Sequence, residues 1–179
     1  MMFKDFNTSK FKNVKYPADF SLKALAEIRK LQRTPLDVKF ANKYDNVYKT
    51  FKDLFNNRTR KFPNKLVQDL ITESQPVILE IKNYHDRIRP NELAEYYNID
   101  LPFHYMKSAQ TPAYPSGHSA QSMLIASVLT DMYPEMQKEL MQAAENISKS
   151  RIVARVHYES DKTMGEKLGK SLFNHLKTA

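Results

Sequence analysis

The chain has 179 residues, of which 41% are hydrophobic and 27% are charged. This is ordinary usage for a folded globular protein of one domain, and it excludes a disordered tail, a fibrous protein or a repeat array. The chain contains no cysteine, which excludes disulfides, thiolate metal sites and cysteine nucleophiles.

The net charge of +8 is unevenly distributed along the chain. Residues 1–60 carry 14 of the 28 basic residues but only 6 of the 20 acidic ones, so the whole excess lies in the first third. One interpretation is a surface that attracts nucleic acid, an acidic partner or a phosphorylated substrate. Because the lysines are scattered, we favour the simpler interpretation that they form the solvated sides of amphipathic helices.

Apolar residues recur at helical rather than alternating spacing, and only three glycines interrupt them, which predicts an all-α domain. Residues 19–33 form the first expected helix, and Pro35 follows as a stop. A second apolar stripe over residues 41–54 predicts another helix. Its aromatic residues resemble a base-stacking set, but their spacing of three to four residues favours core packing.

The remaining two thirds of the chain predict further helices separated by prolines. Residues 66–89 form a third helical region, in which Pro76 predicts a break or a kink. A loop-rich stretch over residues 90–115 has room for a short helix near residues 91–97. Helices are then expected over residues 116–132, from Pro134 to about residue 155, and from about residue 160 to residue 176. Together these form a compact single-domain helical bundle.

Three spaced motifs carry the chemistry. They are Lys82-x6-Arg89-Pro90, Pro115-Ser116-Gly117-His118 at the start of a helix, and Ser150-Arg151-x5-His157-x3-Asp161. A catalyst of phosphoryl transfer must surround three equatorial oxygens with fixed donors and cations. Lys82, Arg89 and Arg151 are suited to that shell, and Ser116 and Gly117 open a helix whose free N–H groups favour an anion.

Two histidines have different expected roles. His157 is the candidate nucleophile, because Asp161 can accept from one ring nitrogen while the other presents its lone pair to phosphorus. His118 is the candidate general acid that protonates the leaving alkoxide. Taken alone, each motif has a structural interpretation, such as a helix start or an N-cap. Eleven residue identities at fixed spacings, each with a chance of roughly one in twenty, are not explained by chance.

The three motifs resemble the signature of the type 2 phosphatidic acid phosphatase (PAP2) superfamily, which includes class A bacterial acid phosphatases, membrane lipid phosphatases and vanadium-dependent haloperoxidases. All eleven signature positions match, within residues 82–161. The resemblance implies a helical bundle of the acid phosphatase and haloperoxidase type, closest to the soluble acid phosphatases. It implies that Lys82, Arg89 and Arg151 bind the phosphate oxygens together with the residues of the second motif.

In the family, the residue matching His157 forms a phosphohistidine, the residue matching Asp161 orients it, and ester hydrolysis requires no metal. The expected activity is therefore that of a metal-independent acid phosphatase acting on small soluble phosphomonoesters. No cofactor is expected, and vanadate should inhibit by mimicking phosphate. The chain is expected to be one domain over residues 1–179, with basic helices in residues 1–60.

Two alternatives remain open: a vanadium-dependent haloperoxidase, and a basic helical nucleic-acid-binding protein built on residues 1–60. The expected partner is a small phosphorylated substrate, and nucleic acid is the less favoured partner. The sequence does not decide whether the protein is a homo-oligomer. No apolar run reaches the roughly 18 residues of a membrane-spanning helix, and residues 1–15 contain no secretory h-region, so we expect a cytoplasmic protein.

Overall fold

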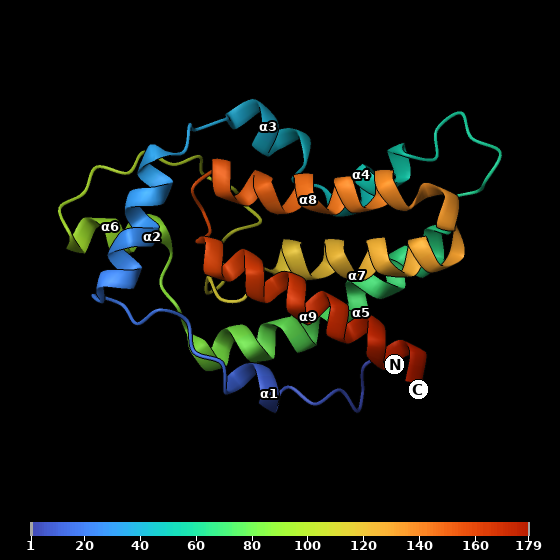
Figure 1. Ribbon diagram of the computed structural model, residues 1–179, viewed down its shortest axis with the longest axis horizontal. Helices are drawn as coiled ribbons and strands as arrows, with labels where there is room; N and C mark the ends of the chain where they lie inside the picture. Colours follow the sequence, from blue (N-terminus) through green and yellow to red (C-terminus); the bar gives the residue numbers. More distant parts are fainter. Residues whose placement is uncertain (1, 179) are drawn as a thin grey trace.

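The computed structural model describes residues 2–178, which form helices and no strand, so the predicted all-α class is confirmed. Figure 1 shows the long helices running side by side and the short ones at their ends and edges. The α-helices are α1 (Ser9–Lys12), α2 (Leu22–Arg33), α3 (Val38–Lys43), α4 (Val47–Asp53), α5 (Asn64–His85), α6 (Pro90–Tyr96), α7 (Gly117–Met132), α8 (Gln137–Val153) and α9 (Glu159–Thr178), and a 3-10 turn, Pro134–Met136, precedes α8.

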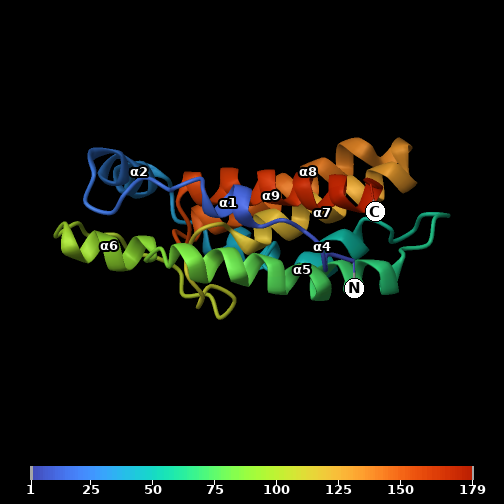
Figure 2. The same cartoon turned by 90° about the horizontal axis from the view of Figure 1, so that it is seen from below.

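Helix α7 is the centre of the bundle and contacts α5, α8 and α9. Figure 2 shows α7 between α5 and α8. Its buried side chains, among them Leu124, Ile125 and Leu129, join the main apolar core with residues from the surrounding helices. Burial of this kind is the main favourable contribution to folding. None of the helices in residues 2–178 combines the length and apolar character that a bilayer-spanning segment requires.

The expected single helix over residues 41–54 is wrong, because the structure has two short helices there. Helix α3 ends at Lys43, and Asn46 then caps α4 by accepting a hydrogen bond from the backbone N–H of Lys49 at 2.8 Å. An asparagine side chain that satisfies a free N–H favours a new helix start over continuation. The turn between α3 and α4 carries Asp45, which reaches the candidate site described below.

Helix α5 is continuous through Pro76, so of the two predicted outcomes, a break or a kink, the break is wrong. Proline removes the hydrogen bond to the carbonyl of Thr72, but both residues are exposed and water can solvate that oxygen. Beyond Pro76 the helix buries Val77, Ile78 and Ile81, which holds it in place. The continuous helix brings Lys82, in its last turn, to the end of the bundle.

The other predicted helices are confirmed. Helix α2 ends at Arg33, α6 is the expected short helix, and α8 ends two residues earlier than predicted, before Arg155 adopts a left-handed backbone conformation with φ 60°. One end of the bundle gathers the C-terminal ends of α5 and α8 and the N-terminal ends of α7 and α9, with α2 and α6 beyond them (Figure 1). A second apolar cluster, which includes Ile28 of α2 and Leu93 of α6, packs there.

Candidate active site

The three motifs converge at this end of the bundle, although they are far apart in the sequence. Lys82 lies in the last turn of α5, Arg89 caps the start of α6, and Ser116 caps α7. Arg151 lies in the last turn of α8, and His157 stands in the short connection to α9. All five side chains are buried.

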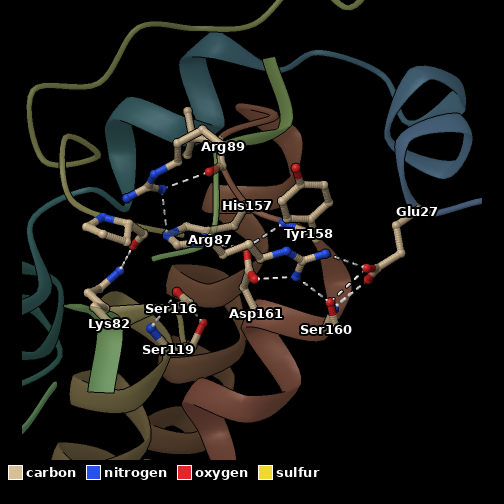
Figure 3. Close-up of polar contacts among 12 residues, drawn as sticks. Glu27, Lys82, Arg87, Arg89, Ser116, Ser119, His157, Tyr158, Ser160 and Asp161 are labelled. Atoms are coloured by element: carbon tan, nitrogen blue, oxygen red, sulfur yellow. Dashed lines mark hydrogen bonds and ion pairs between the residues drawn. The ribbon is translucent and has the colours of Figure 1, made fainter. Parts of the chain in front are cut away.

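His157 contacts a carboxylate on one side of its ring and a guanidinium on the other. Its Nδ1 lies 3.0 Å from Asp161 Oδ2, and its Nε2 lies 3.0 Å from a terminal nitrogen of Arg89 (Figure 3). A guanidinium can only donate, whereas an ionised carboxylate can only accept. These partners therefore fix one tautomer, in which Nδ1 carries the proton and the Nε2 lone pair points toward Arg89.

The surroundings of His157 keep its imidazole neutral. Burial lowers its pKa well below the usual value, and the charges of Arg89, Lys82 and Arg151 add to that lowering. Burial has the opposite effect on the acid, and raises the pKa of Asp161 to about 6 although the adjacent Arg87 guanidinium opposes the shift. Near neutral pH the pair is thus a neutral imidazole that donates to a carboxylate.

Arg89 donates hydrogen bonds to two backbone carbonyl oxygens. Its Nε and one terminal nitrogen donate to the carbonyl of Thr111 at 2.9 and 2.7 Å, and the nitrogen that faces His157 also donates to the carbonyl of Val156 at 2.8 Å. Burial lowers the pKa of Arg89 to about 10, which leaves the group charged under ordinary conditions. A cation fixed in this way keeps its position beside the His157 ring.

Lys82, at the end of α5, lies beside Gly117 at the start of α7. The ammonium of Lys82 donates to the carbonyl of Pro112 at 2.5 Å. A Cβ added at Gly117 would lie 3.7 Å from Cε of Lys82 and 3.5 Å from Cγ2 of Ile78, which are ordinary contacts. The fold therefore tolerates a side chain at residue 117, and such a side chain would narrow the space beside Lys82.

Ser116 is used to begin α7. Its hydroxyl accepts hydrogen bonds from the backbone N–H of Ser119 at 3.3 Å and from the Ser119 hydroxyl at 3.0 Å. Its own backbone N–H donates to the carbonyl of Asp161 at 3.0 Å. The second and third motifs are thus joined directly through the backbone.

Arg151 and His118 share a partner that the sequence motifs do not contain, Asp45. One carboxylate oxygen of Asp45 accepts from Arg151 at 2.6 Å and from the Ser108 hydroxyl at 2.6 Å, and lies 3.3 Å from Nε2 of His118. The same Nε2 lies 2.8 Å from the backbone carbonyl of Asp45. The hydrogen bond from His118, with those from Ser108 and the charge of Arg151, holds the pKa of the Asp45 carboxyl well below its usual range.

Arg151 retains one free donor. Its Nε is buried and has no hydrogen-bond partner within the part of the chain that the structure describes. A buried donor of this kind is costly unless a ligand satisfies it. Burial lowers the pKa of His118, and the charge of Arg151 adds to the lowering, while Asp45 opposes it.

Arg87 is the second residue that sequence reasoning missed. Its guanidinium donates to the free oxygen of Asp161, Oδ1, at 2.6 Å (Figure 3). It lies within the six unspecified residues of the first motif, so nothing in the motif distinguishes it from its neighbours. Two other histidines that flank the motifs have structural partners elsewhere: His85 contacts the carbonyl of Phe11, and His104 contacts Asn42.

A cavity of about 220 Å³ opens beside Arg89 and is lined by Phe103, Tyr105 and Met106 among others. A larger groove of about 930 Å³ runs between α4 and α8 and is lined by no residue of the three motifs. Arg89 lines the smaller cavity and also a second one of about 320 Å³, which Arg87 and Thr111 line as well. The arrangement as a whole offers cationic donors, a helix start and a neutral imidazole to a tetrahedral anion.

Comparison with known proteins gives sequence relatives and a similar fold. The non-specific acid phosphatases of Salmonella typhi and Salmonella typhimurium are 33% and 32% identical to the chain over 97 residues, which cover 54% of this chain and 38% of each relative. The aligned part is thus well under half of these curated relatives. A bacterial vanadium-dependent iodoperoxidase has a similar fold, with a TM-score of 0.75 and 18% identity over 97% of this chain and 53% of its own.

The family is decided by the sequence comparison. The model of the PAP2 superfamily matches residues 67–176, a span that holds all three motifs, helices α7 and α8 and all but the last two residues of α9. Because this match covers more than half of the chain, the protein belongs to the PAP2 superfamily.

Proposed function

We propose that the protein is a phosphatase that hydrolyses small phosphomonoesters in two steps through a phosphorylated His157. The observation that carries the proposal is the pair of contacts on the His157 ring. Its Nδ1–H donates to Asp161, and its Nε2 lone pair lies beside Arg89. The sequence identity with non-specific acid phosphatases further supports the proposal.

In the first step, the Nε2 lone pair attacks phosphorus and the P–O bond to the leaving group breaks. Lys82, Arg89 and Arg151 neutralise the charge on the equatorial oxygens, and the unpartnered Nε–H of Arg151 supplies one donor. Protonated His118 gives its proton to the leaving alkoxide. The carboxylate of Asp161 stabilises the cationic phosphoimidazole as it forms.

In the second step, water attacks the phosphohistidine and the P–N bond breaks. His118, now neutral, takes a proton from that water, and phosphate leaves as His157 regains its lone pair. Protein cations supply the positive charge in both steps, so the proposed reaction uses no metal. Vanadate, which can adopt the trigonal-bipyramidal geometry of five-coordinate phosphorus, is expected to compete with the substrate.

The test is release of phosphate from a generic aryl phosphate in the presence of EDTA. The wild type should turn over and His157→Ala should lose activity by at least about 10³-fold, since the nucleophile is gone. His104→Ala is the matched control, because that imidazole contacts Asn42 and belongs to none of the three motifs. Equal rates for wild type and His157→Ala would refute the proposal.

Two further measurements separate this mechanism from its alternatives. When a reaction with substrate radiolabelled in its phosphoryl group is quenched, the wild type should yield an acid-labile labelled phosphoprotein. His157→Ala should yield none. Halide-dependent bromination of a dye with vanadate and peroxide would instead indicate a haloperoxidase. The aromatic cavity beside Arg89 is smaller than sites for drug-sized ligands, which favours a small leaving group.

A further inference from the structure

Glu27 of α2 accepts three hydrogen bonds, one from Arg87 within the first motif and two from Ser160 within the third. Its carboxylate accepts from a terminal nitrogen of Arg87 at 2.9 Å, and from the backbone N–H and the hydroxyl of Ser160 at 2.8 Å each. The other terminal nitrogen of Arg87 donates to Asp161 at 2.6 Å and to the Ser160 hydroxyl at 2.7 Å. Figure 3 shows the continuous line of contacts from Glu27 through Arg87 and Asp161 to the His157 ring.

The central member of this line, Arg87, is held at both terminal nitrogens. The Arg87 side chain is fully buried and lies between two aromatic rings, 3.7 Å from the centre of Tyr158 and 4.7 Å from that of Tyr16. Its guanidinium therefore has a defined plane as well as two carboxylate partners. Asp161 is fully buried too, whereas the Glu27 side chain is 15% exposed.

A second set of contacts joins α2 to the connection between α8 and α9, which carries His157. Arg155 turns back from the α8–α9 connection and donates to the carbonyls of Gln32 at 3.2 Å and Thr34 at 2.8 Å, at the C-terminal end of α2. Helix α2 thus contacts the segment around His157 at Arg155 in the connection and at Ser160 in the first turn of α9. This helix lies outside residues 67–176, the span that matches the family.

We propose that Glu27 and Arg87 are positioning residues for the reaction at His157, so that the N-terminal helix α2 is a working part of the active site. The inference rests on the proposed function for its catalytic consequence. Arg87 holds Asp161 by Oδ1, which leaves Oδ2 aimed at the Nδ1 proton of His157. Glu27 holds Arg87 in that place and balances its charge.

Both the charge and the geometry of Arg87 support this role. Without the Glu27 carboxylate, the buried Arg87 guanidinium keeps its contacts with Asp161 and the Ser160 hydroxyl but loses the carboxylate partner of its second terminal nitrogen, so it rotates more easily about the remaining contacts. Rotation moves Oδ1 and therefore turns Oδ2 away from His157. Partners of this kind around metal-bound histidines are worth about 10-fold to 100-fold in activity, and we expect a loss in the lower part of that range for Glu27→Gln.

The first measurement does not depend on turnover. In ¹H–¹⁵N spectra of the imidazoles, the Nδ1 proton of His157 should give a slowly exchanging signal, assigned by its absence in His157→Gln. In Glu27→Gln we expect that proton to exchange with water about 10-fold faster or more. Arg87→Lys should act in the same direction, because lysine lacks the fork that reaches both carboxylates.

The second measurement is kinetic. With an aryl phosphate, kcat of Glu27→Gln should fall about 10-fold while KM stays within about twofold, because Glu27 does not contact the phosphate-binding cations. The matched control is Lys30→Gln, which removes the exposed ion pair between α2 and Glu159 of α9 without touching Arg87. This control should keep both the proton signal and kcat.

Thermal unfolding identifies the variants that are folded at the assay temperature. If Glu27→Gln is not folded, Glu27→Asp replaces it, because aspartate keeps the charge but has a shorter side chain. Unchanged proton exchange in a folded Glu27 variant overturns the proposal, as does unchanged kcat. If the wild type hydrolyses no phosphoester, the proposed function fails while the exchange rates still decide whether Glu27 positions His157.

Discussion

The negative charge of Asp45 lies beside Arg151 and His118, two groups that are proposed to act on the substrate. Its carboxylate lies on Arg151 and within 3.3 Å of His118, and its side chain is 37% exposed. A phosphate oxygen approaching Arg151 meets this carboxylate, and like charges at such distances repel. Because solvent screens a part-exposed group, the effect is modest.

We therefore predict that Asp45→Asn binds inorganic phosphate about threefold to tenfold more tightly than the wild type, measured by calorimetry. The neutral amide keeps the oxygen that accepts from Ser108 and Arg151 but removes the negative charge that repels the phosphate. Asp53→Asn, on the exposed ion pair with Lys49, is the control and should leave phosphate affinity unchanged. Weaker binding by Asp45→Asn would mean that the carboxylate orients Arg151 for the ligand.

Lys82 provides a pH dependence of phosphate binding. Burial lowers its pKa to about 7, and the charges of Arg89 and Arg151 add to the lowering, while Asp161 opposes it. Above that pH the free protein loses the proton, and an anion that needs the charged ammonium must restore it. Affinity should therefore fall as pH rises from about 6 to 8, by up to tenfold per unit above the pKa.

The comparison is with Lys82→Met, which has no such group. The titration of phosphate itself is common to both proteins, so a steeper fall for the wild type isolates Lys82. Parallel curves for the two proteins would contradict the prediction.

The residues found by the motifs and those that were missed differ in the range of their contacts. Eleven identities at fixed spacing pointed to Lys82, Arg89, Arg151 and the histidines, and the structure brings these residues to one end of the bundle. Asp45 meets Arg151 across 106 residues, and Arg87 meets Asp161 across 74. No local spacing records such a pairing, so only the packed fold could show it.

Among the helices, those with a clear cap and a regular apolar face were predicted well. Helix α7 follows Ser116 as its N-cap, as expected. The two errors arose where a single side chain or its exposure decides the outcome: Asn46 restarts a helix within a continuous apolar stripe, and exposed Pro76 leaves α5 intact. Periodicity carries no information on either.

The crossing of α9 over α7 requires two glycines, and one of them adjoins the site. A Cβ at Gly165 would lie 2.8 Å from Cβ of Ser119 and inside contact distance of the Ser116 carbonyl oxygen. Backbone cannot retreat as a flexible side chain can, so the helices would separate. Gly169 meets α7 in the same way one turn later, at Met123.

We predict that Gly165→Ala lowers the free energy of unfolding by about 1–3 kcal/mol, measured by denaturant titration, and also lowers kcat by displacing Ser116 from Asp161. The matched substitution is Gly117→Ala, whose Cβ would make only ordinary contacts. That variant should keep its stability and lose phosphate affinity. A Gly165→Ala protein as stable as the wild type would show that the crossing is looser than the backbone contact implies.

At the scale of the whole molecule, the basic excess of the first third is distributed rather than gathered. Lys12, Lys49, Arg58 and Arg60 each form an ion pair with an acidic residue, and most of these pairs are exposed. Exposed pairs contribute little to stability, and they lower the field that a polyanion would meet. The first third also supplies Glu27 and Asp45, so its acidic residues, rather than its lysines, reach the site.

The site draws its groups from α5, α6, α7, α8 and α9, with α2 behind them, so an anion bound there holds most of the bundle together. Ligand that binds only the folded protein adds RT ln(1 + [L]/Kd), about 2.7 kcal/mol at a concentration of 100 Kd. For a chain of this length that corresponds to a rise in Tm of about 5–10 °C. We predict this shift with vanadate or phosphate, measured by calorimetry against chloride at equal ionic strength. Arg151→Gln, which removes the buried unpartnered donor, should abolish most of the shift, and a wild-type Tm that does not respond to either anion would refute an anion site at this end of the bundle.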